Sequence, residues 1–324
     1  MLLIIMLHWF NGLKNVIMKK YQVSVVIINY NSSDYTLDCV KSIIKTIDAG
    51  LLYNIVIVDN NSKEDDFRNL SNNCGTFGNV QIVKSKINLG FSGGNMFGVQ
   101  YVNAQYIFFL NNDTVLLNDC ISILYRFMIE NSSVGICTGQ MYNSDMSFHH
   151  SFNYFPTLAL KFFGSDLLRL FNPRAFPNKK VEYKNPLKVN FVTGAAMFID
   201  YSKFAKVAGF DTNHFLYCEE EDIAMKLKRK GYSAYLVPEA KFIHHMGKST
   251  KRNFLIEKEN YISLLYYHRK YSSAIVYFLL KVLYAIKSLK KFYKGYDNVR
   301  MAAFIIKGAN PKYSLKNKQE LRIE

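Results

Sequence analysis

Val23-Ser24-Val25-Val26-Ile27-Ile28 is followed at once by the polar residues Asn29-Tyr30-Asn31-Ser32 and then by a helical pattern over 34–48. A nearly continuous run of β-branched residues predicts a strand that is buried on both faces. Strands of this kind belong to parallel sheets, which need a crossover helix between neighbouring strands. The stretch therefore predicts the first unit of an α/β fold.

The same order of strand, polar turn and helix recurs along the first 113 residues. The expected strands are Val23–Ile28, Ile55–Val58, Val80–Val83 and Tyr106–Leu110. The helices expected between them lie over 34–48, 63–72 and about 95–103. This alternation implies right-handed crossovers and a mostly parallel, doubly wound sheet. Ligands of such a sheet bind beyond the carboxyl ends of its strands.

The regular alternation stops over residues 141–188, which hold His149-His150, many aromatic residues and four prolines. We expect an insertion there that faces the substrate. A strand over Val189–Ile199 then restores the pattern, and a helix over 219–230 is capped by Gly231. Two short extended pieces, Tyr235–Val237 and Ala240–Ile243, lead to the histidine pair 244–245.

The positive charge of the chain lies in its last part. The formal charge is +16, yet residues 241–324 alone hold 18 Lys and Arg against 5 Asp and Glu. Residues 253–294 are predicted to be helical, and Ala274–Leu289 is an amphipathic pattern with one apolar arc and one lysine-rich arc. Such a helix suits the surface of an anionic membrane, while the alternative is an ordinary helix docked on the domain. We expect a membrane surface and no nucleic acid as partner.

The amino terminus and the cysteines set further limits. Met1–Phe10 is apolar for about ten residues, too short to cross a membrane, and lacks the features of a signal peptide. We expect Met18 to be the natural start and 1–17 an upstream extension, with a membrane-touching arm as the alternative. The five scattered cysteines form no C-x-x-C pair, which argues against a zinc site.

Two of the polar segments suit a nucleotide. Asp59 at a strand end can accept a hydrogen bond from a ligand, although an Asx turn or helix cap is the preferred explanation when this residue is taken alone. The glycine-rich segment Asn88–Asn95 precedes a helix whose free N–H groups can receive a phosphate, although a tight turn is an equal explanation. Because G-x-G-x-x-G is absent, a nicotinamide-dependent oxidoreductase is disfavoured.

Two other segments suit a divalent metal ion. Asn111-Asn112-Asp113 places amides and a carboxylate directly after a buried strand, and Mg²⁺ or Mn²⁺ beside a diphosphate needs only one or two protein ligands. His244-His245 adds an imidazole at another strand end, although a lone histidine is more often structural. A turn alone also explains the triplet.

The acidic run Glu219-Glu220-Glu221-Asp222 has two explanations. Acids in the first turn of a helix and lysines in its last turn complement the helix dipole. Four successive acids on a helix nevertheless span most of its circumference, so at least one is expected to face the sheet. Burial would raise its pKa and make it a usable general base.

Seven motifs in this order resemble the glycosyltransferases of family 2, which have a GT-A fold, and most closely their bacterial rhamnosyltransferase-type members. They are Val25–Asn31, Val58–Ser62, Asn88–Asn95, Leu110–Thr114, Thr193–Ala196, Phe215–Asp222 and Pro238–His244. The resemblance covers about residues 22–250. It implies a GT-A domain over 18–252. The charge and the amphipathic pattern of the remaining residues predict a basic, helical, membrane-associating extension over 253–324.

The resemblance also implies roles for individual residues. The base and ribose of the nucleotide and the donor sugar would be held by Asn29, Tyr30, Asp59, Asn88, Gly90, Gly94, Asn95 and Asn112. The metal ion, Mg²⁺ or Mn²⁺, would be held by Asp113, Asn111 and His244. The general base would be Glu220, with Glu219 or Asp222 as alternatives, because the usual Glu-Asp pair of the family is Glu-Glu here. The first metal-motif position is Asn111 instead of Asp.

The expected activity is an inverting transfer of a sugar from a nucleotide-diphosphate donor to a hydroxyl group of a glycan acceptor. A carboxylate would remove the proton of the hydroxyl while a metal ion neutralises the departing diphosphate. The donor would be dTDP-rhamnose or a UDP-sugar, and the acceptor a lipid-linked glycan of a surface polysaccharide. We expect a peripheral location on the cytoplasmic face of a bacterial inner membrane. The alternative is a non-catalytic nucleotide-sugar-binding or membrane-binding protein on the same fold.

Overall fold

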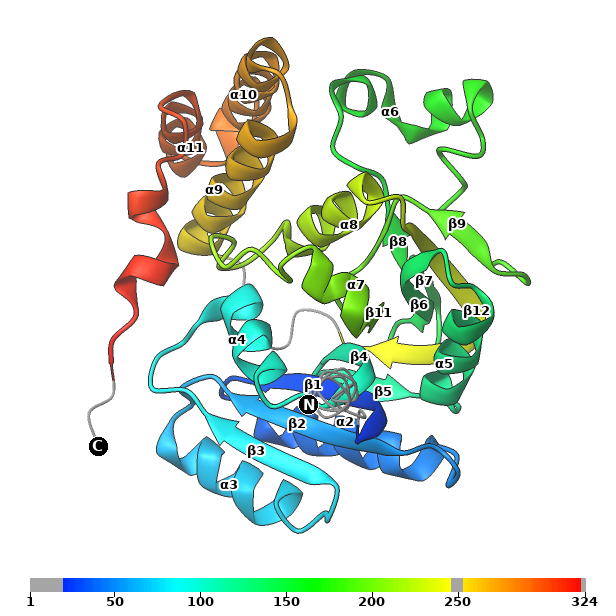
Figure 1. Cartoon of the computed structure of the whole chain (residues 1–324). Helices are drawn as coiled ribbons and strands as arrows, with labels where there is room; N and C mark the ends of the chain where they lie inside the picture. The colour runs from blue at the N-terminus through cyan, green and yellow to red at the C-terminus, as the bar shows by residue number, and fades with distance from the viewer. Residues whose placement is uncertain (1–19, 246–252, 322–324) are drawn as a thin grey trace, which may run out of the picture.

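The computed structural model describes residues 20–245 and 253–321 (Figure 1). The expectations about residues 1–17 and Met18 fall outside these residues. Four parallel strands form one half of a large sheet, in the order β3 (Val80–Lys84), β2 (Tyr53–Asp59), β1 (Tyr21–Asn29) and β4 (Ala104–Asn111). Their crossover helices are α2 (Ser33–Thr46), α3 (Glu64–Cys74) and α4 (Gly90–Val99). The predicted units are therefore confirmed in this half.

The other half makes the sheet mixed. β11 (Ala196–Asp200) runs antiparallel between β4 and β6 (Val134–Tyr142), and β12 (Ser233–His244) runs parallel to β6. The short strands β5 (Thr114–Leu116), β7 (Phe148–His149) and β9 (Leu187–Val189) pair antiparallel with these longer strands. Because β11 is reversed, its amino end lies at the same edge of the sheet as the carboxyl end of β4.

Two strand predictions were wrong in detail. The strand expected over 189–199 is interrupted, and its middle part forms β10 (Phe191–Val192), which pairs with β8 (Phe152–Asn153) in a separate small sheet. The two pieces expected over 235–243 form the single strand β12, whose pairing with β6 shifts register between Val237 and Lys241. Pro238 lies at this shift, where a missing N–H is tolerated.

The glycine-rich helix begins earlier than predicted. α4 starts at Gly90 instead of about residue 95, so Gly94 and Gly98 lie inside it. A Cβ on Gly98 would come within 2.7 Å of the Val26 side chain, and one on Gly94 within 3.0 Å of Ile28. The glycines thus let the helix approach β1 and β2 closely, a packing requirement that turn propensities do not reveal.

Apolar clusters cover both faces of the sheet. One contains side chains of α2, α3 and α5 (Cys120–Glu130), and the other contains side chains of α4, α7 (Tyr201–Lys206) and α8 (Glu219–Arg229). The segment 141–188 forms β7, β8 and a kinked helix, α6 (Leu158–Phe171), before β9. These layers hold the carboxyl ends of β1, β2 and β4 open along one edge.

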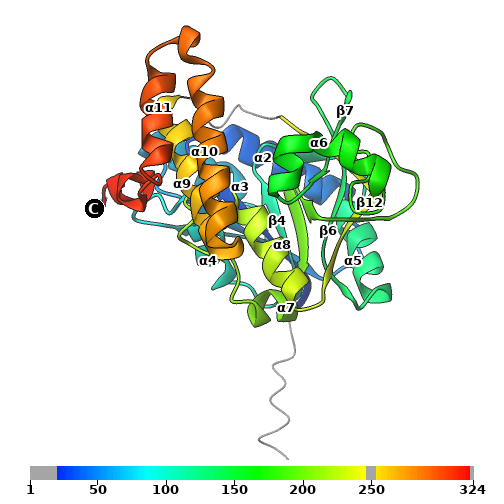
Figure 2. The same cartoon turned by 90° about the horizontal axis from the view of Figure 1, so that it is seen from above.

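The C-terminal part consists of α9 (Phe254–Tyr271), α10 (Ala274–Leu289) and α11 (Asp297–Ile306), followed by short 3-10 turns. The continuous helix expected over 253–294 is broken at Ser272-Ser273, and the side chain of Ser273 caps α10 by accepting from Val276 N–H. The three helices pack side by side (Figure 2). They share a small apolar core of their own. No helix within residues 20–245 or 253–321 combines the length and the apolar character that a membrane crossing requires.

Candidate active site

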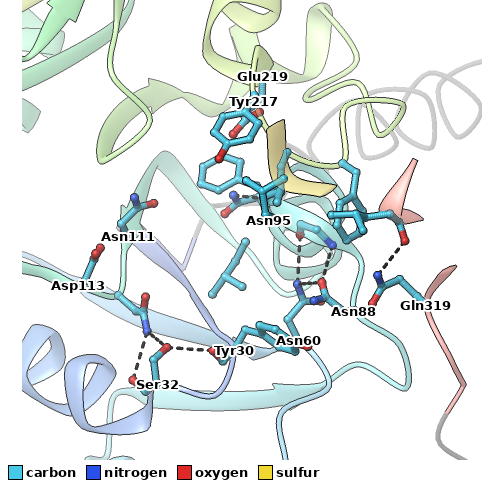
Figure 3. Close-up of a pocket in the computed structure, with 18 of the residues that line it drawn as sticks. Tyr30, Ser32, Asn60, Asn88, Asn95, Asn111, Asp113, Tyr217, Glu219 and Gln319 are labelled. Atoms are coloured by element: carbon cyan, nitrogen blue, oxygen red, sulfur yellow. Dashed lines mark hydrogen bonds between the residues drawn. The ribbon is translucent and has the colours of Figure 1, made fainter. Parts of the chain in front are cut away.

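A cavity of about 840 Å³ opens at the carboxyl edge of the sheet. Asn111 and Asp113 lie on one side, Asn60, Asn88 and Gln319 lie opposite, and Tyr217 and Glu219 lie between them (Figure 3). The predicted site residues that border it are Tyr30, Asn88, Gly90, Asn95, Asn111, Asn112, Asp113, Glu219 and His244. Most polar side chains that border this cavity were therefore predictable from the sequence.

Asn29 and Asp59, predicted to touch a nucleotide, are instead buried beneath the cavity wall. The amide Nδ2 of Asn29 donates to Asp59 Oδ1 at 3.1 Å and to Asp66 Oδ2 at 2.8 Å. Asp59 Oδ2 accepts from Ser62 N–H at 3.2 Å. In this structure both residues hold the ends of β1 and β2 in place, and half-exposed Tyr30 is the neighbour that borders the cavity.

The amide of Asn60 builds the opposite wall, and the sequence analysis did not single it out. Its Nδ2 donates to Asn88 Oδ1 at 3.0 Å, and its Oδ1 accepts from Leu89 N–H at 2.9 Å. Gly90 follows with φ of +69°, and a Cβ there would lie only 2.2 Å from the carbonyl oxygen of Phe215. Only glycine fits this position, which brings α4 against the loop that precedes α8.

Asn111, Asp113 and His244 form the corner predicted to hold a metal ion. Asp113 Oδ1 lies 3.0 Å from His244 Nε2, and Asn111 Nδ2 lies 3.4 Å from the same nitrogen. The pairing of β12 with β5 creates this contact, because it aligns His244 with Thr114. His245 differs, since its Nδ1 lies 2.7 Å from Ser144 Oγ. The structure thus selects His244 from the histidine pair.

The donor set of this corner fits a divalent ion. It offers a carboxylate oxygen, an imidazole nitrogen and an amide oxygen at the mouth of an open cavity, and such ligands suit Mg²⁺ or Mn²⁺. Two ligands at right angles on one octahedral ion lie about 3 Å apart, close to the separation of Asp113 and His244. Asp113 is buried, so its charge calls for a nearby positive partner.

Strained backbone brings the acidic run to the cavity. Tyr217 and Cys218 both have positive φ, 72° and 67°, immediately before α8 begins at Glu219. For side chains larger than glycine this conformation costs about 1–3 kcal/mol per residue and is concentrated at functional sites. It aims the first turn of α8 at the cavity, with Glu219 on the wall.

Glu219, Glu220 and Glu221 lie together in the first turn of α8, where Glu219 is buried and Glu220 and Glu221 are partly exposed. Burial raises the pKa of Glu219, Glu220 and Glu221, and the charge of Glu220 raises the pKa of the other two further. Within the described residues, one carboxylate oxygen of each lacks a hydrogen-bond partner. Gly194 lies close to both Glu220 and Phe91, because a Cβ on Gly194 would be 3.7 Å from Glu220 Oε1 and 3.8 Å from the ring of Phe91. Phe91 borders the cavity. Glu220 therefore lies beside the wall, next to Glu219.

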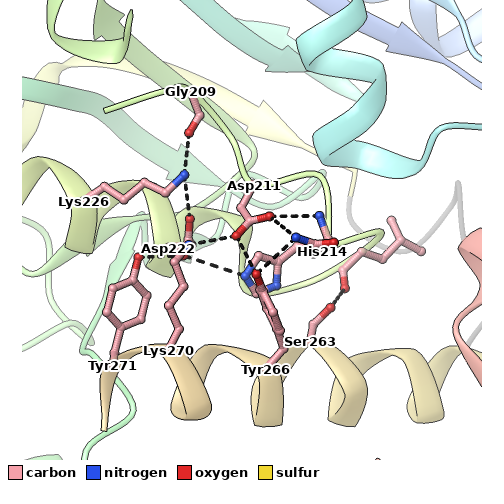
Figure 4. Close-up of polar contacts among 11 residues, drawn as sticks. Gly209, Asp211, His214, Asp222, Lys226, Ser263, Tyr266, Lys270 and Tyr271 are labelled. Carbon is pink, nitrogen blue, oxygen red and sulfur yellow. Dashed lines mark hydrogen bonds and ion pairs between the residues drawn. The ribbon is translucent and has the colours of Figure 1, made fainter. Parts of the chain in front are cut away.

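Asp222, the third candidate base, does not border the cavity and lies in a network of charges (Figure 4). Its carboxylate lies 2.6 Å from Lys270 Nζ and 3.2 Å from Lys226 Nζ, and accepts from Tyr271 O–H at 2.7 Å. The side chain is fully buried. Its contacts with α9 serve to fix the start of α8, so the geometry leaves Glu219 and Glu220 as candidates for the base.

The network contains another acid and a histidine. Although burial alone would raise its pKa, the hydrogen bond from Lys270 holds the pKa of Asp211 well below its usual range. Burial lowers the pKa of His214 to about 4. Asp211, His214 and Asp222 have oxygen and nitrogen atoms within 4.8 Å of one another, as in a metal site, but the two lysine ammonium groups already neutralise the acids.

The C-terminal segment completes the cavity, and no sequence signal indicated this. Leu315 and Gln319 border it next to Asn60 and Asn88, and Asn253 and Ile256 at the start of α9 border it as well. Buried Glu259 anchors the segment by accepting from Ser314 O–H and Leu315 N–H, both at 2.8 Å. Residues beyond 253 are therefore part of the site in addition to forming a basic extension.

Comparison with solved structures supports the fold. GalNAc-T7, crystallised with UDP, GalNAc and Mn²⁺, matches 89% of this chain and 54% of its own with a TM-score of 0.60 and 14% identity. The mannosyltransferase PcManGT from Pyrobaculum calidifontis, in complex with GDP-Man and Mn²⁺, matches 90% of this chain and 73% of its own with a TM-score of 0.52 and 12% identity. The predicted GT-A-like α/β architecture is confirmed, with a mixed sheet.

Sequence comparison supports the family. The rhamnosyltransferase WbbL of Escherichia coli (strain K12) is 25% identical over 242 residues, which cover 72% of this chain and 86% of that protein. The N-acetylglucosaminyl-diphospho-decaprenol L-rhamnosyltransferase of Mycobacterium tuberculosis (strain H37Rv) is 34% identical over 65 residues, 20% of this chain and 21% of that protein. The model of glycosyl transferase family 2 matches residues 24–206. The chain therefore belongs to glycosyl transferase family 2, and it resembles the rhamnosyltransferases among its relatives.

Proposed function

We propose that this glycosyltransferase moves a sugar from a nucleotide-diphosphate donor to a hydroxyl group of a glycan, with inversion at the anomeric carbon. The observation that carries the proposal is the arrangement of one cavity. An Asp–His pair lies on one side, an amide-rich wall lies opposite, and the buried carboxylate Glu219 borders the space between them with Glu220 beside it. The Asp–His pair suits the diphosphate of a donor, and the carboxylates suit the proton of an attacking hydroxyl group.

Different residues of the cavity have different roles in the proposed reaction. Glu220, whose pKa is raised by burial, accepts the proton of the acceptor hydroxyl as that oxygen attacks the anomeric carbon. The bond from the anomeric carbon to the diphosphate breaks, and the diphosphate leaves with the bonding electrons. Tyr30, Asn60 and Asn88 orient the nucleotide. Glu219 places a second carboxyl group next to the general base, Glu220.

Asp113 and His244, with Asn111, would hold Mg²⁺ or Mn²⁺. When bound, the ion neutralises negative charge that develops on the departing diphosphate. Both structural relatives were crystallised with Mn²⁺ and a nucleotide, which supports a divalent ion in this corner. Because position 111 is an amide, the protein supplies one carboxylate, Asp113, to this corner.

A deoxysugar donor such as dTDP-rhamnose and a lipid-linked glycan acceptor are the substrates we infer, since two relatives are named as rhamnosyltransferases and one of these as acting on a diphospho-decaprenol. The basic C-terminal helices support a peripheral place at the cytoplasmic face of a bacterial membrane. The product would be part of a surface polysaccharide.

A donor screen tests the activity. The purified protein with Mn²⁺ is expected to release a nucleoside diphosphate from at least one of dTDP-rhamnose, UDP-glucose, UDP-galactose and GDP-mannose when a polyprenyl-diphosphate glycan is present. Chelation with EDTA is expected to stop the release. If the protein binds nucleotides but releases none from any donor, it is a non-catalytic binding protein on this fold.

The C-terminal segment is expected to contribute to donor affinity. Replacing Gln319 by alanine removes an amide from the wall beside Asn60 and Asn88, and the loss of one hydrogen-bonding contact is worth about 1 kcal/mol. We expect the donor KM to rise about fivefold while kcat changes by less than about twofold. The exposed neighbour Lys318→Ala serves as the control. A donor KM equal to that of the control would remove Gln319 from the binding site.

A further inference from the structure

The helix α6 has no buried residue, although most of its side chains are apolar. Phe162 and Phe163 are 61% and 60% exposed, and Leu170 and Phe171 are 78% and 82% exposed. Gly164, with φ of +73°, divides the helix into two short pieces. A soluble protein rarely exposes four large apolar side chains on one short segment unless something else covers them.

The helix α10 is docked with its apolar arc outward. Its buried residues include Leu280 and Tyr284, whereas Phe278 and Leu279 are 56% and 42% exposed. Ile286 and Leu289 lie on the same exposed arc and are 45% and 48% exposed. An ordinary docked amphipathic helix would bury this arc, so the structure argues against that alternative for α10.

The two helices meet. α6 contacts α10, and the ammonium group of Lys161 lies 5.6 Å from the centre of the Tyr284 ring. Burial lowers the pKa of Lys161, and the nearby charge of Lys287 lowers it further. Seen from above, α6 and α10 both lie on the near side of the molecule (Figure 2). We call the exposed apolar side chains of these two contacting helices, Phe162, Phe163, Leu170, Phe171, Phe278 and Leu279, the α6–α10 face.

The charges around this face favour one kind of partner over another. On the helical wheel Lys281 and Lys290 flank the exposed arc of α10 on its two sides, and the tail as a whole carries 18 basic against 5 acidic residues. Apolar side chains surrounded by lysines match the acyl chains and anionic headgroups of a bilayer surface. A second copy of the chain would instead bring lysines against lysines. Charge complementarity therefore favours a lipid surface.

The face lies on the same side of the sheet as the acidic run. In Figure 1, α8, which begins with that run, lies between the pair α6 and α10 and the sheet. Although burial raises the pKa of Glu221, the charge of Lys161 on α6 acts to lower it. A bilayer on the α6–α10 face would thus meet the protein on the side of the acidic cluster, whereas the nucleotide wall is formed by the loops after β2 and β3.

We propose that the α6–α10 face is a two-helix membrane contact that inserts the kinked α6 and the outward arc of α10 among anionic lipids, next to the site where a lipid-linked acceptor reacts. The inference rests on the proposed function for the acceptor and extends it by naming the surface. It assigns membrane binding to α6 as well as to the basic tail.

Vesicle sedimentation tests the proposal. The probe is vesicles of phosphatidylcholine and phosphatidylglycerol in a ratio of 70:30, compared with pure phosphatidylcholine. The full-length chain is expected to bind the anionic vesicles more tightly. The α6 variant Leu170→Ser/Phe171→Ser and the α10 variant Phe278→Ser/Leu279→Ser are each expected to weaken the partition coefficient at least tenfold. The control Leu52→Ser/Ile129→Ser changes exposed apolar residues elsewhere and is expected to bind like the unaltered chain.

Nucleotide binding without vesicles, measured on the same variants, separates this proposal from the proposed function. Normal nucleotide binding with lost vesicle binding supports the α6–α10 face. If neither the unaltered chain nor any variant releases nucleoside diphosphate while the vesicle results are as expected, the enzymatic function is overturned. The proposed membrane contact is then still supported. Vesicle binding by the α6 variant equal to the control overturns the proposal. The proposal is also overturned if light scattering shows that the unaltered chain is a dimer, that the α6 variant is a monomer, and that the two bind vesicles equally.

Discussion

Replacing Glu220 by glutamine is expected to lower kcat for sugar transfer by about 10²–10⁴-fold, the range that a general base contributes. Glutamine has nearly the same shape but cannot accept the proton of the acceptor hydroxyl. Because Glu220 lies beside the cavity wall and not on the nucleotide side, the affinity for the nucleotide is expected to stay within about twofold. Release of nucleoside diphosphate and calorimetric titration of the nucleotide measure the two effects.

Two matched variants complete this experiment. Glu219→Gln is expected to reduce kcat less than Glu220→Gln, and Glu239→Gln, which changes an exposed acid, is expected to have no effect. Because burial raises the pKa of Glu220, kcat/KM of the unaltered enzyme should fall with decreasing pH at a midpoint above the ordinary glutamate value. Full activity of Glu220→Gln combined with an inactive Glu219→Gln would transfer the role of base to Glu219.

Replacing Asp113 by asparagine is expected to weaken Mn²⁺ binding more than tenfold and to lower kcat/KM about 100-fold at a fixed, limiting concentration of the ion. Within the part of the chain that the structure describes, Asp113 is the carboxylate that contacts His244 at this corner of the cavity, and an amide oxygen is a poorer ligand for a hard cation. Electron paramagnetic resonance of free Mn²⁺ measures the affinity independently of turnover. Added Mn²⁺ is expected to restore part of the activity.

The histidine pair supplies the control. His244→Ala is expected to weaken Mn²⁺ binding in the same direction as the Asp113 variant, by about tenfold. His245→Ala is expected to leave Mn²⁺ binding unchanged, because the His245 ring contacts Ser144. The backbone N–H of residue 245, which donates to the backbone carbonyl of Asp113, is retained in this variant. Equal Mn²⁺ affinity of the Asp113 variant and the unaltered protein would remove this corner as the metal site.

Much of the fold was predictable because the decisive signals are local. The β-branched runs that became β1 and β2 and the aromatic, apolar run that became β4 are largely buried, and the polar residues that follow them reach one edge of the sheet by the geometry of parallel strands. The reversal of β11 was not predictable, because strand direction in this half depends on how the chain returns from the segment 141–188. The early start of α4 depended on close packing at Gly94 and Gly98.

The site was predictable to a similar degree. Asp113, His244 and the acidic run were identified from their positions at element ends, yet the roles of Asn29, Asp59 and Asp222 depend on contacts 30 to 49 residues away along the chain. Asn60 lies inside the motif Val58–Ser62 but had no role assigned to it, and Gln319 lies in none of the motifs. Asn60 became visible through its bonds to Asn88 and Leu89, and Gln319 through the return of the C-terminal segment to the cavity.

The sequence by itself determined the family, the parallel half of the sheet and the chemical types gathered at its edge, because hydrophobic period and motif order are properties of the linear chain. Only the tertiary structure decided which acids face the cavity, which histidine joins Asp113, and that the apolar arc of α10 faces outward beside α6. Those outcomes depend on strained turns, strand register and helix docking, which arise from contacts between residues distant in the chain.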